Sequence, residues 1–389
     1  MTAISPMGIL SAIQLARVPI LAFFIVGVFW GSFAASVPDI KAGLGVSDAV
    51  FGTLLLGNAF GLVTAMWMAP RIDRWLGSRG MQVVGVIFSC WFVMPGVVQT
   101  PIGFFLVLVG MGVFSGLLDV LMNARVSELE ARHGRTLMNV SHGMFSVAYA
   151  VAALGTGFAR DAGYAPVVAL AGAGLVGIAL AAQIRMAPDE VDSSDAATSS
   201  RLPWLIVLTC GAIVLAAFMS EATVETWSAL HIERTLNGDP LAGAIGPVML
   251  GLTMAVGRIG GQGLSDRFDD RLVIVLASGL ASVGAMIAAV APTPGVAYLG
   301  FGIFGLGVSV IGPLGLALVG RMVAARFRTE AIAKAAVMGF CGFFIAPVLM
   351  GLISEAAGLR VAYGAVAAFV LITLPLVWML PRLGKPVAG

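Results

Sequence analysis

The sequence predicts an all-helical membrane protein whose twelve transmembrane helices form two six-helix bundles. Three observations carry this prediction: a composition too apolar for water, a series of long apolar stretches, and a polar segment near the middle of the chain. Of the 389 residues, 59% are hydrophobic and 11% are charged, whereas a soluble domain carries about 25% charged residues. So few polar side chains could not cover a water-soluble surface, which excludes a soluble enzyme, a nucleic-acid-binding protein and a disordered chain.

Each apolar stretch is long enough for one membrane crossing, because a hydrocarbon core about 30 Å thick needs around 20 helical residues. The stretches are continuous rather than alternating, which favours helices over barrel strands. The predicted spans of the first half are 18–38, 49–69, 81–99, 102–124, 138–159 and 164–186. Those of the second half are 204–230, 242–264, 272–291, 295–320, 332–354 and 359–380. The first stretch is too long for a signal peptide, so we expect it to be retained as a span.

Basic residues predict the orientation in the membrane. With both termini in the cytoplasm, all but four of the 22 lysines and arginines lie on the cytoplasmic side, as the positive-inside rule requires. The four outside are Lys41, Arg160, Arg234 and Arg360. We therefore expect cytoplasmic termini and a multi-pass protein of the cell's inner (plasma) membrane.

A polar, serine-rich and acidic segment runs from Pro188 to Arg201 and is typical of a flexible linker. Its position near the midpoint divides the chain in two. We predict an N-terminal six-helix bundle over 1–186, a cytoplasmic linker over 187–202 and a C-terminal six-helix bundle over 203–389.

The two halves repeat each other in sequence. Gly52-Thr-Leu-Leu-Leu-Gly57 in span two is similar to Gly246-Pro-Val-Met-Leu-Gly251 in span eight. Asp73-Arg74 after span two is matched by Asp266-Arg267 after span eight. Two parallel six-span repeats are typical of transporters that rock around a site near the membrane midplane.

The loop from Ala69 to Arg79 resembles the signature loop of the major facilitator superfamily, in which Asp-Arg is followed by a glycine and basic residues. The loop from Gly261 to Arg271 is similar. The resemblance implies ion pairs that gate the cytoplasmic mouth, and breaking such pairs biases a two-state packing. The gate residues it implies are Asp73, Arg74, Arg125, Asp266, Arg267 and Arg321. The alternative is that these are solvated loop charges.

Three acidic residues lie inside the apolar runs: Asp119 in span four, and Glu221 and Glu225 in span seven. Each costs about 2.5–3.5 kcal/mol to insert into a membrane, so each requires an explanation. The resemblance places spans four and seven around a central cavity, where neighbouring carboxylates bind protons more readily. We predict that Asp119, Glu221 and Glu225 couple transport to protons, with Glu221 or Asp119 as the protonation site. Glu225 would lie nearer the outer mouth, where the alternative is that it only reaches the lipid interface.

The stretch Gly116-Leu-Leu-Asp119-Val-Leu-Met-Asn123 resembles the fucose permease branch of the superfamily, where an acid and an asparagine four residues later bind sugar and proton. Asn139 and His142 match polar residues of that branch at the start of span five, whereas its acid in span one has no counterpart here. The stretch of span seven from Glu221 to Leu230 is similar to uncharacterised bacterial relatives of the branch.

Polar and aromatic side chains on the predicted cavity helices complete the set of substrate-binding candidates. Packing between helices is the alternative for the histidine and the tryptophans. The candidates are Asn123, Trp30, Ser32, Asn139, His142, Trp227 and Ser228.

These patterns predict a secondary active transporter that moves a small polar, sugar-like solute by alternating access, in symport with protons. The alternative is a proton-driven efflux antiporter for drugs or amphipathic metabolites, although span five lacks the Gly-Pro pair of that group. An intramembrane protease is disfavoured because only Asp119 is an intramembrane aspartate, and a solute sensor because no signalling domain is attached. We expect no cofactor, no metal and no nucleic acid. The expected partners are the solute, protons and the lipid bilayer, with the chain acting as a monomer.

Overall fold

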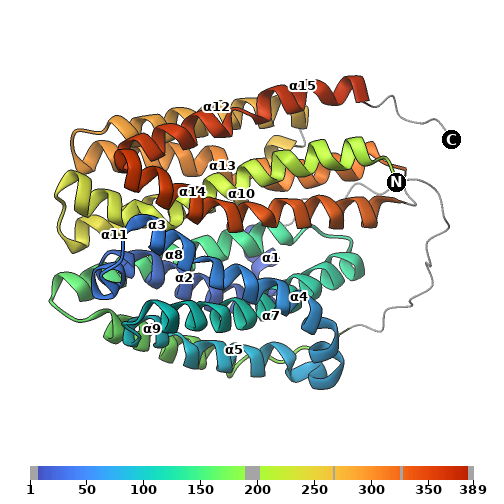
Figure 1. Ribbon diagram of the computed structural model, residues 1–389. Coiled ribbons are helices and arrows are strands. Elements are labelled where there is room, and N and C mark those ends of the chain that lie inside the picture. Colours follow the sequence, from blue (N-terminus) through green and yellow to red (C-terminus); the bar gives the residue numbers. More distant parts are fainter. Residues whose placement is uncertain (1–7, 189–201, 266–267, 325–326, 384–389) are drawn as a thin grey trace.

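Every regular element in the described part of the chain is a helix (Figure 1). The computed structural model describes residues 8–188, 202–265, 268–324 and 327–383. The first half contains α1 (Ile9–Leu15), α2 (Arg17–Leu44), α3 (Asp48–Leu54), α4 (Leu56–Leu76), η1 (Gly77–Arg79), α5 (Gly80–Trp91), α6 (Met94–Val97), α7 (Pro101–His133), α8 (Met138–Asp161) and α9 (Pro166–Ala181). The second half contains α10 (Trp204–Leu230), η2 (His231–Thr235), α11 (Pro240–Ser265), α12 (Asp270–Val290), α13 (Pro294–Met322), α14 (Arg328–Val370) and α15 (Thr373–Leu383).

Each predicted span coincides with one helix or with consecutive helices. Within the described residues, eight helical segments are both long and apolar enough to cross a membrane. Two of them, Asp48–Val97 and Glu330–Leu380, each contain two predicted spans, which are separated by a glycine with non-helical backbone angles: Gly77 (φ 51°) in the first and Gly358 (φ 84°) in the second. The helix α9 is short, and α8 is less hydrophobic because polar residues such as Asn139 and His142 lie along it.

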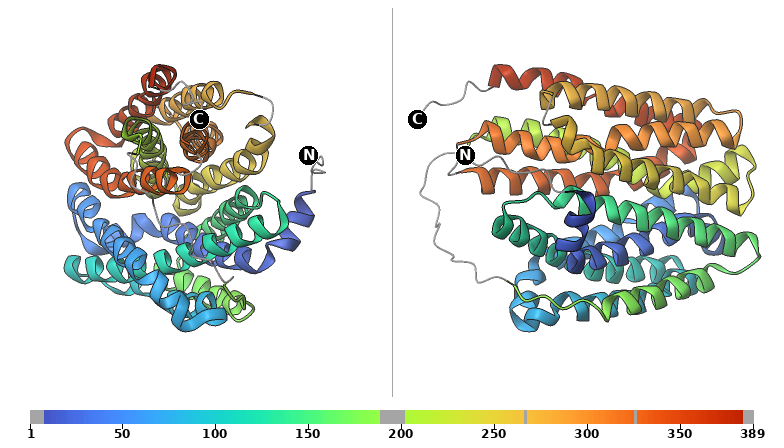
Figure 2. Two further views of the ribbon diagram at one scale, coloured as in Figure 1. Left: turned by 90° about the vertical axis from the view of Figure 1, so that its right-hand side faces the viewer. Right: turned by 180° about the vertical axis from the view of Figure 1, so that it is seen from behind.

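The helices of each half pack mainly against one another. In the first half, α2 packs against α8 and α9, α4 against α7, and α5 against α9. In the second half, α10 packs against α13 and α14, and α12 against the same two helices. Figure 1 shows α2 to α9 in the lower part of the view and α10 to α15 in the upper part, and the end view in Figure 2 shows the same separation.

The two most extensive contacts between the halves are those of α8 with α11 and of α3 with α14, and α2 also packs against α10. Glycines bring the backbones close at the first two. A Cβ atom on Gly52 of α3 would overlap the carbonyl of Pro347 in α14. On Gly251 of α11, a Cβ atom would lie 2.8 Å from the ring of Tyr149 in α8. Small residues at helix contacts are the usual means of close packing within membranes.

One end of the helical bundle contains η2, a π-helical turn that follows α10, and we call it the η2 end. The end of α2, the start of α3 and the end of α8 lie at this same end. It lies on the left in Figure 1. The opposite end contains the last turns of α4 and α7 and the first turns of α10 and α12. The chain turns at the η2 end through Gly45, whose φ of 63° suits glycine.

Candidate functional site

A buried polar cluster lies where α8, α10 and α11 meet. The guanidinium of Arg258 in α11 forms an ion pair with Glu221 in α10, with 2.7 Å between Nη2 and Oε1. Its Nη1 donates a hydrogen bond of 2.8 Å to Oγ of Ser146 in α8. Glu221 is only 6% exposed, and the Arg258 side chain 11%. The cluster therefore contains a largely shielded ion pair within the second half, and the hydrogen bond to Ser146 joins it to the first half.

The sequence analysis missed Arg258 and assigned it to the cytoplasmic basic residues. The structure corrects this, because Arg258 lies within α11 and its side chain is paired in the interior. The sequence did contain an indication of this position, because Arg258 falls inside the predicted span 242–264. The argument that identified the three acids applies equally to an intramembrane arginine, which needs a partner or water.

Further polar groups of α8 and α10 surround this cluster. Ser146 also donates a hydrogen bond of 3.1 Å to the carbonyl of His142, whose ring packs edge-on against Phe23 at 4.8 Å. The Tyr149 hydroxyl lies 3.4 Å from the backbone carbonyl of Glu225. Glu225 is half-buried, and among the described residues its carboxylate forms no ion pair. Glu221 and Glu225 therefore differ in environment, although they are one turn apart.

Asp119 and Asn123 lie together on α7, as their spacing predicts. The Asn123 amide donates to the Asp119 carboxylate at 3.1 Å and to the Asp119 carbonyl at 2.8 Å. Both residues are half-buried. No hydrogen bond or ion pair joins this pair to Glu221 or Glu225 in the part of the chain that the structure describes. The acids of spans four and seven are thus not brought into direct contact.

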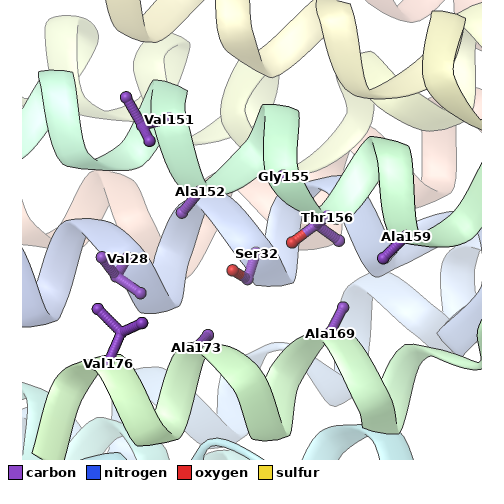
Figure 3. Close-up of a pocket in the computed structure, with 10 residues that line it drawn as sticks. All are labelled: Val28, Ser32, Val151, Ala152, Gly155, Thr156, Ala159, Ala169, Ala173 and Val176. Carbon is purple, nitrogen blue, oxygen red and sulfur yellow. The ribbon is translucent and has the colours of Figure 1, made fainter.

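Two of the predicted substrate-binding residues lie on α2. Trp30 is half-buried and packs edge-on against Phe29 and Phe33, at ring distances of 5.0 and 5.7 Å. Ser32 lines a mainly apolar pocket of about 230 Å³ between α2, α8 and α9, and Thr156 is the other hydroxyl residue of its lining (Figure 3). This pocket lies within the first half, so Ser32 is placed apart from the cluster around Arg258.

Trp227 and Ser228 are completely buried in α10. The Trp227 ring meets Phe51 of α3 edge-on at 5.9 Å, so it packs against the other half. The Trp227 Nε1 and the Oγ atoms of Ser228 and Ser36 have no hydrogen-bond partner in the described structure. Asn139 is half-buried near the start of α8.

The predicted gate residues form ion pairs at the end opposite η2. Asp73 in α4 pairs with Arg125 in α7, and Arg125 also contacts Glu128 at 2.5 Å. Arg74 is exposed. Arg321 in α13 pairs at 2.8 Å with Asp270, at the start of α12. Both pairs join helices of the same half.

Part of the predicted second-half gate, Asp266 and Arg267, lies outside the described residues. The partner that the structure gives to Arg321 is Asp270, four residues beyond the aspartate of the repeated motif.

A second set of ion pairs lies at the η2 end and crosses between the halves. Arg160 of α8 forms two hydrogen bonds of 2.7 Å to Asp39 of α2 and two more, of 2.7 and 3.1 Å, to Glu233 of η2. Its Nη1 also donates to the carbonyl of Ala35 at 2.8 Å. The Arg160 side chain is 1% exposed. This arginine is therefore enclosed by acceptors from both halves.

A similar network surrounds Asp48 at the start of α3. Arg234 of η2 binds both carboxylate oxygens of Asp48, at 2.7 and 2.6 Å. Lys41 lies 2.9 Å from the same carboxylate, and Ser354 of α14 donates to it at 2.5 Å. Lys41, Arg160 and Arg234 were predicted on the outer side, but most of their acidic partners are distant in the chain and were not predicted.

Comparison with known families gives a match over most of the second half. A family model described as Major Facilitator Superfamily matches residues 210–388. An uncharacterized MFS-type transporter of Yersinia pestis is 27% identical over 354 residues, covering 90% of this chain and 92% of the relative. The membrane protein MosC of Rhizobium meliloti is 28% identical over 341 residues, covering 87% of this chain and 83% of MosC.

Solved structures match the fold over nearly the whole chain. A D-xylose-proton symporter superposes with a TM-score of 0.76 at 12% identity, covering 98% of this chain and 99% of that one. A bacterial homolog of the human lysosomal transporter Spinster gives 0.73 at 16% identity, covering 96% of each chain. At these identities, the likeness concerns the fold alone.

Proposed function

We propose that this chain is a transporter of the major facilitator superfamily and not an enzyme, and that it moves a small polar, sugar-like solute across the cytoplasmic membrane in symport with protons. The observation that carries the proposal is the buried cluster of Arg258, Glu221 and Ser146, which links the two halves. An arginine in an apolar interior is retained only where a partner and a role offset its cost.

Through the cluster around Arg258, the contact between the two halves is linked to an ion pair within the second half. The pair between Arg258 and Glu221 lies within the second half, whereas the hydrogen bond from Arg258 to Ser146 crosses to the first. When the halves rock, the crossing bond breaks and the ion pair moves with its own half. Bound solute or water then replaces Ser146 as the acceptor for Arg258.

The proton, in this proposal, is carried by Glu225 or Asp119. Our sequence-based prediction named Glu221 or Asp119, but Glu221 has Arg258 as a fixed cation. Glu225 and Asp119 form no ion pair among the described residues, so neither carboxylate has a fixed cation as its partner. Glu221 then serves to hold Arg258, while protons bind and leave at a neighbouring acid.

The polar groups available to a solute suit one that carries hydroxyl groups. Asn123, Asn139 and His142 offer amide and imidazole groups from the first half. Ser36 of α2 and Trp227 and Ser228 of α10 leave buried polar atoms without partners among the described residues. Such unpaired atoms are costly, and a hydroxylated solute would satisfy them once the halves separate there.

We further propose that the η2 end faces outward, with both termini in the cytoplasm and the halves acting as two six-helix bundles over 1–186 and 203–389. Cation–aromatic pairs at the opposite end support this orientation. Arg71 lies 4.3 Å from the ring centre of Trp67, and Lys334 lies 4.4 Å from that of Trp204. Tryptophan and basic residues together are typical of the cytoplasmic membrane interface.

Uptake into proteoliposomes under an imposed pH gradient tests the proposal, using a panel of sugars, polyols and drugs. We expect a polar member of the panel to accumulate when the outside is acidic. Asp119→Asn or Glu225→Gln should abolish pH-driven accumulation while solute exchange continues. Glu330→Gln is the matched control, because Glu330 is an exposed acid whose ion pair in the described structure is with Lys334 of its own helix.

Three outcomes would count against the proposal. Accumulation that is independent of the pH gradient would contradict proton coupling. Expulsion of drugs in exchange for protons would favour the efflux antiporter. Binding without any accumulation would indicate a sensor.

A further inference from the structure

The turn η2 contains two neighbouring residues of opposite charge that face different partners. Successive residues point about 100° apart around a helix axis, so adjacent side chains diverge. Glu233 reaches Arg160 of α8, whereas Arg234 reaches Asp48 of α3. This single turn of the second half thereby contacts two separate helices of the first half, α8 and α3. Single π-helical turns are rare and are frequently found at functional sites.

The contact with α8 is enclosed. Arg160 is held by Asp39 of its own half and by Glu233 of the other, with nearly all of its side chain buried. Gly243 of α11 makes room for Glu233, because a Cβ atom there would lie 2.6 Å from the Glu233 Cγ. Opening this interface would leave the Arg160 guanidinium with only Asp39 and a backbone carbonyl as partners.

The contact with α3 is equally specific. Arg234 binds Asp48 with two parallel hydrogen bonds, a geometry that adds both strength and direction to an ion pair. Ser354 of α14 binds the same carboxylate and also accepts a hydrogen bond of 3.0 Å from Arg234. A neighbouring bond, from the Ala49 amide to Glu355 at 2.8 Å, continues this contact between α3 and α14.

We propose that η2 is the outer gate of this transporter, with Glu233 closing the interface with α8 and Arg234 closing the interface with α3. The proposal rests on the alternating-access function and the orientation proposed above. Because both residues lie on one turn, the two interfaces open together. The gate ion pairs at the opposite end differ in kind, since Asp73–Arg125 and Asp270–Arg321 each lie within one half.

Distance measurements between two spin labels test the gate without any solute. The labels are attached to Ala42→Cys at the end of α2 and Thr293→Cys before α13, both exposed at the η2 end. Cys90, Cys210 and Cys341 are replaced by serine or alanine. The otherwise unchanged protein in nanodiscs should show mainly one short distance. Glu233→Gln with Arg234→Gln should raise the ratio of long to short distances by about tenfold or more, because hydrogen bonds to charged groups are lost.

Arg360→Gln is the matched control, because Arg360 is an arginine of the same end that donates to Ala289 within its own half. It should leave the distances unchanged. If the double variant matches this control, the outer gate is overturned. Should the double variant fail to fold, Arg160→Gln and Asp48→Asn remove the same ion pairs from the side of the first half. These variants must shift the distances in the same direction. Unchanged distances would again overturn the outer-gate proposal.

Failure of the gate and failure of the proposed transport are distinguishable. A shift in distances supports the gate even where no solute of the panel accumulates. Normal proton-driven uptake together with unchanged distances overturns the gate and leaves the transport proposal in place.

Discussion

Arg258 donates a hydrogen bond of 2.8 Å to Ser146, a residue 112 positions away on the other half of the molecule. The same guanidinium is paired with Glu221. A single buried arginine therefore connects α8 to α10 and α11. Because the hydrogen bond crosses between the halves and the ion pair lies within the second half, the two can be tested separately.

Replacing Ser146 with alanine removes the crossing bond and leaves the ion pair intact. We expect the melting temperature of the purified protein in detergent to fall, because a hydrogen bond to a charged group contributes about 1.5–3 kcal/mol. The control is Ser141→Ala, since Ser141 is a buried serine of the same helix whose hydroxyl, among the described residues, bonds only to the Leu137 carbonyl one turn away. Equal melting temperatures for the two variants would show that the crossing bond contributes nothing.

Arg258→Met alone leaves Glu221 buried without its cation, and we expect a loss of about 3–5 kcal/mol of stability, as is usual when one partner of a buried pair is removed. Glu221→Gln in the same chain should restore part of this loss, because no unpaired charge remains. Thermal unfolding of the two single variants and the double variant measures the coupling between the residues. Strictly additive effects would contradict a direct ion pair.

Asp73→Asn removes the charge opposite Arg125, which is almost fully buried. We expect the initial rate of solute uptake to fall by about tenfold, the change that about 1.4 kcal/mol produces. Arg71→Gln serves as the control, because Arg71 is exposed in the same helix and bonds to the Trp67 carbonyl one turn away. Unchanged uptake by Asp73→Asn would show that this pair is not part of the cytoplasmic gate.

Gly52→Ala places a methyl group against the Pro347 carbonyl at the contact between α3 and α14. We expect the spin-label distances at the η2 end to lengthen, because the two backbones must move apart. Gly279→Ala is a matched helical change with open space around it. It should leave the distances unchanged and stabilise its helix by up to about 1 kcal/mol. Identical distances in the two variants would mean that the close contact at Gly52 is not needed for closure.

Local features were predictable from the sequence because they depend on residues near one another in the chain. The apolar runs predicted every long helix, and the spacing of Asp119 and Asn123 predicted their contact along α7. The long apolar segments are fewer than the predicted spans because the break between two spans can be confined to a few residues, as at Gly77 in the segment Asp48–Val97.

The candidate site was only partly predictable. Glu221 was identified as an intramembrane acid, but its partner Arg258 was assigned to the cytoplasmic side. An arginine seven residues before the end of a long helix is close enough to the interface to be counted with the loop charges. Only the depth of its side chain in the packed structure distinguishes the two cases.

The sequence by itself determined that this chain is a helical membrane protein with a repeated organisation and acids within its spans. These conclusions need only the free energy of placing each residue in lipid or water, which is a property of composition and spacing. The tertiary structure decided which charges meet: Glu221 with Arg258, Glu233 with Arg160, and Arg234 with Asp48. Their partners lie on other helices, and ion pairing depends on distance and orientation in space rather than on order along the chain.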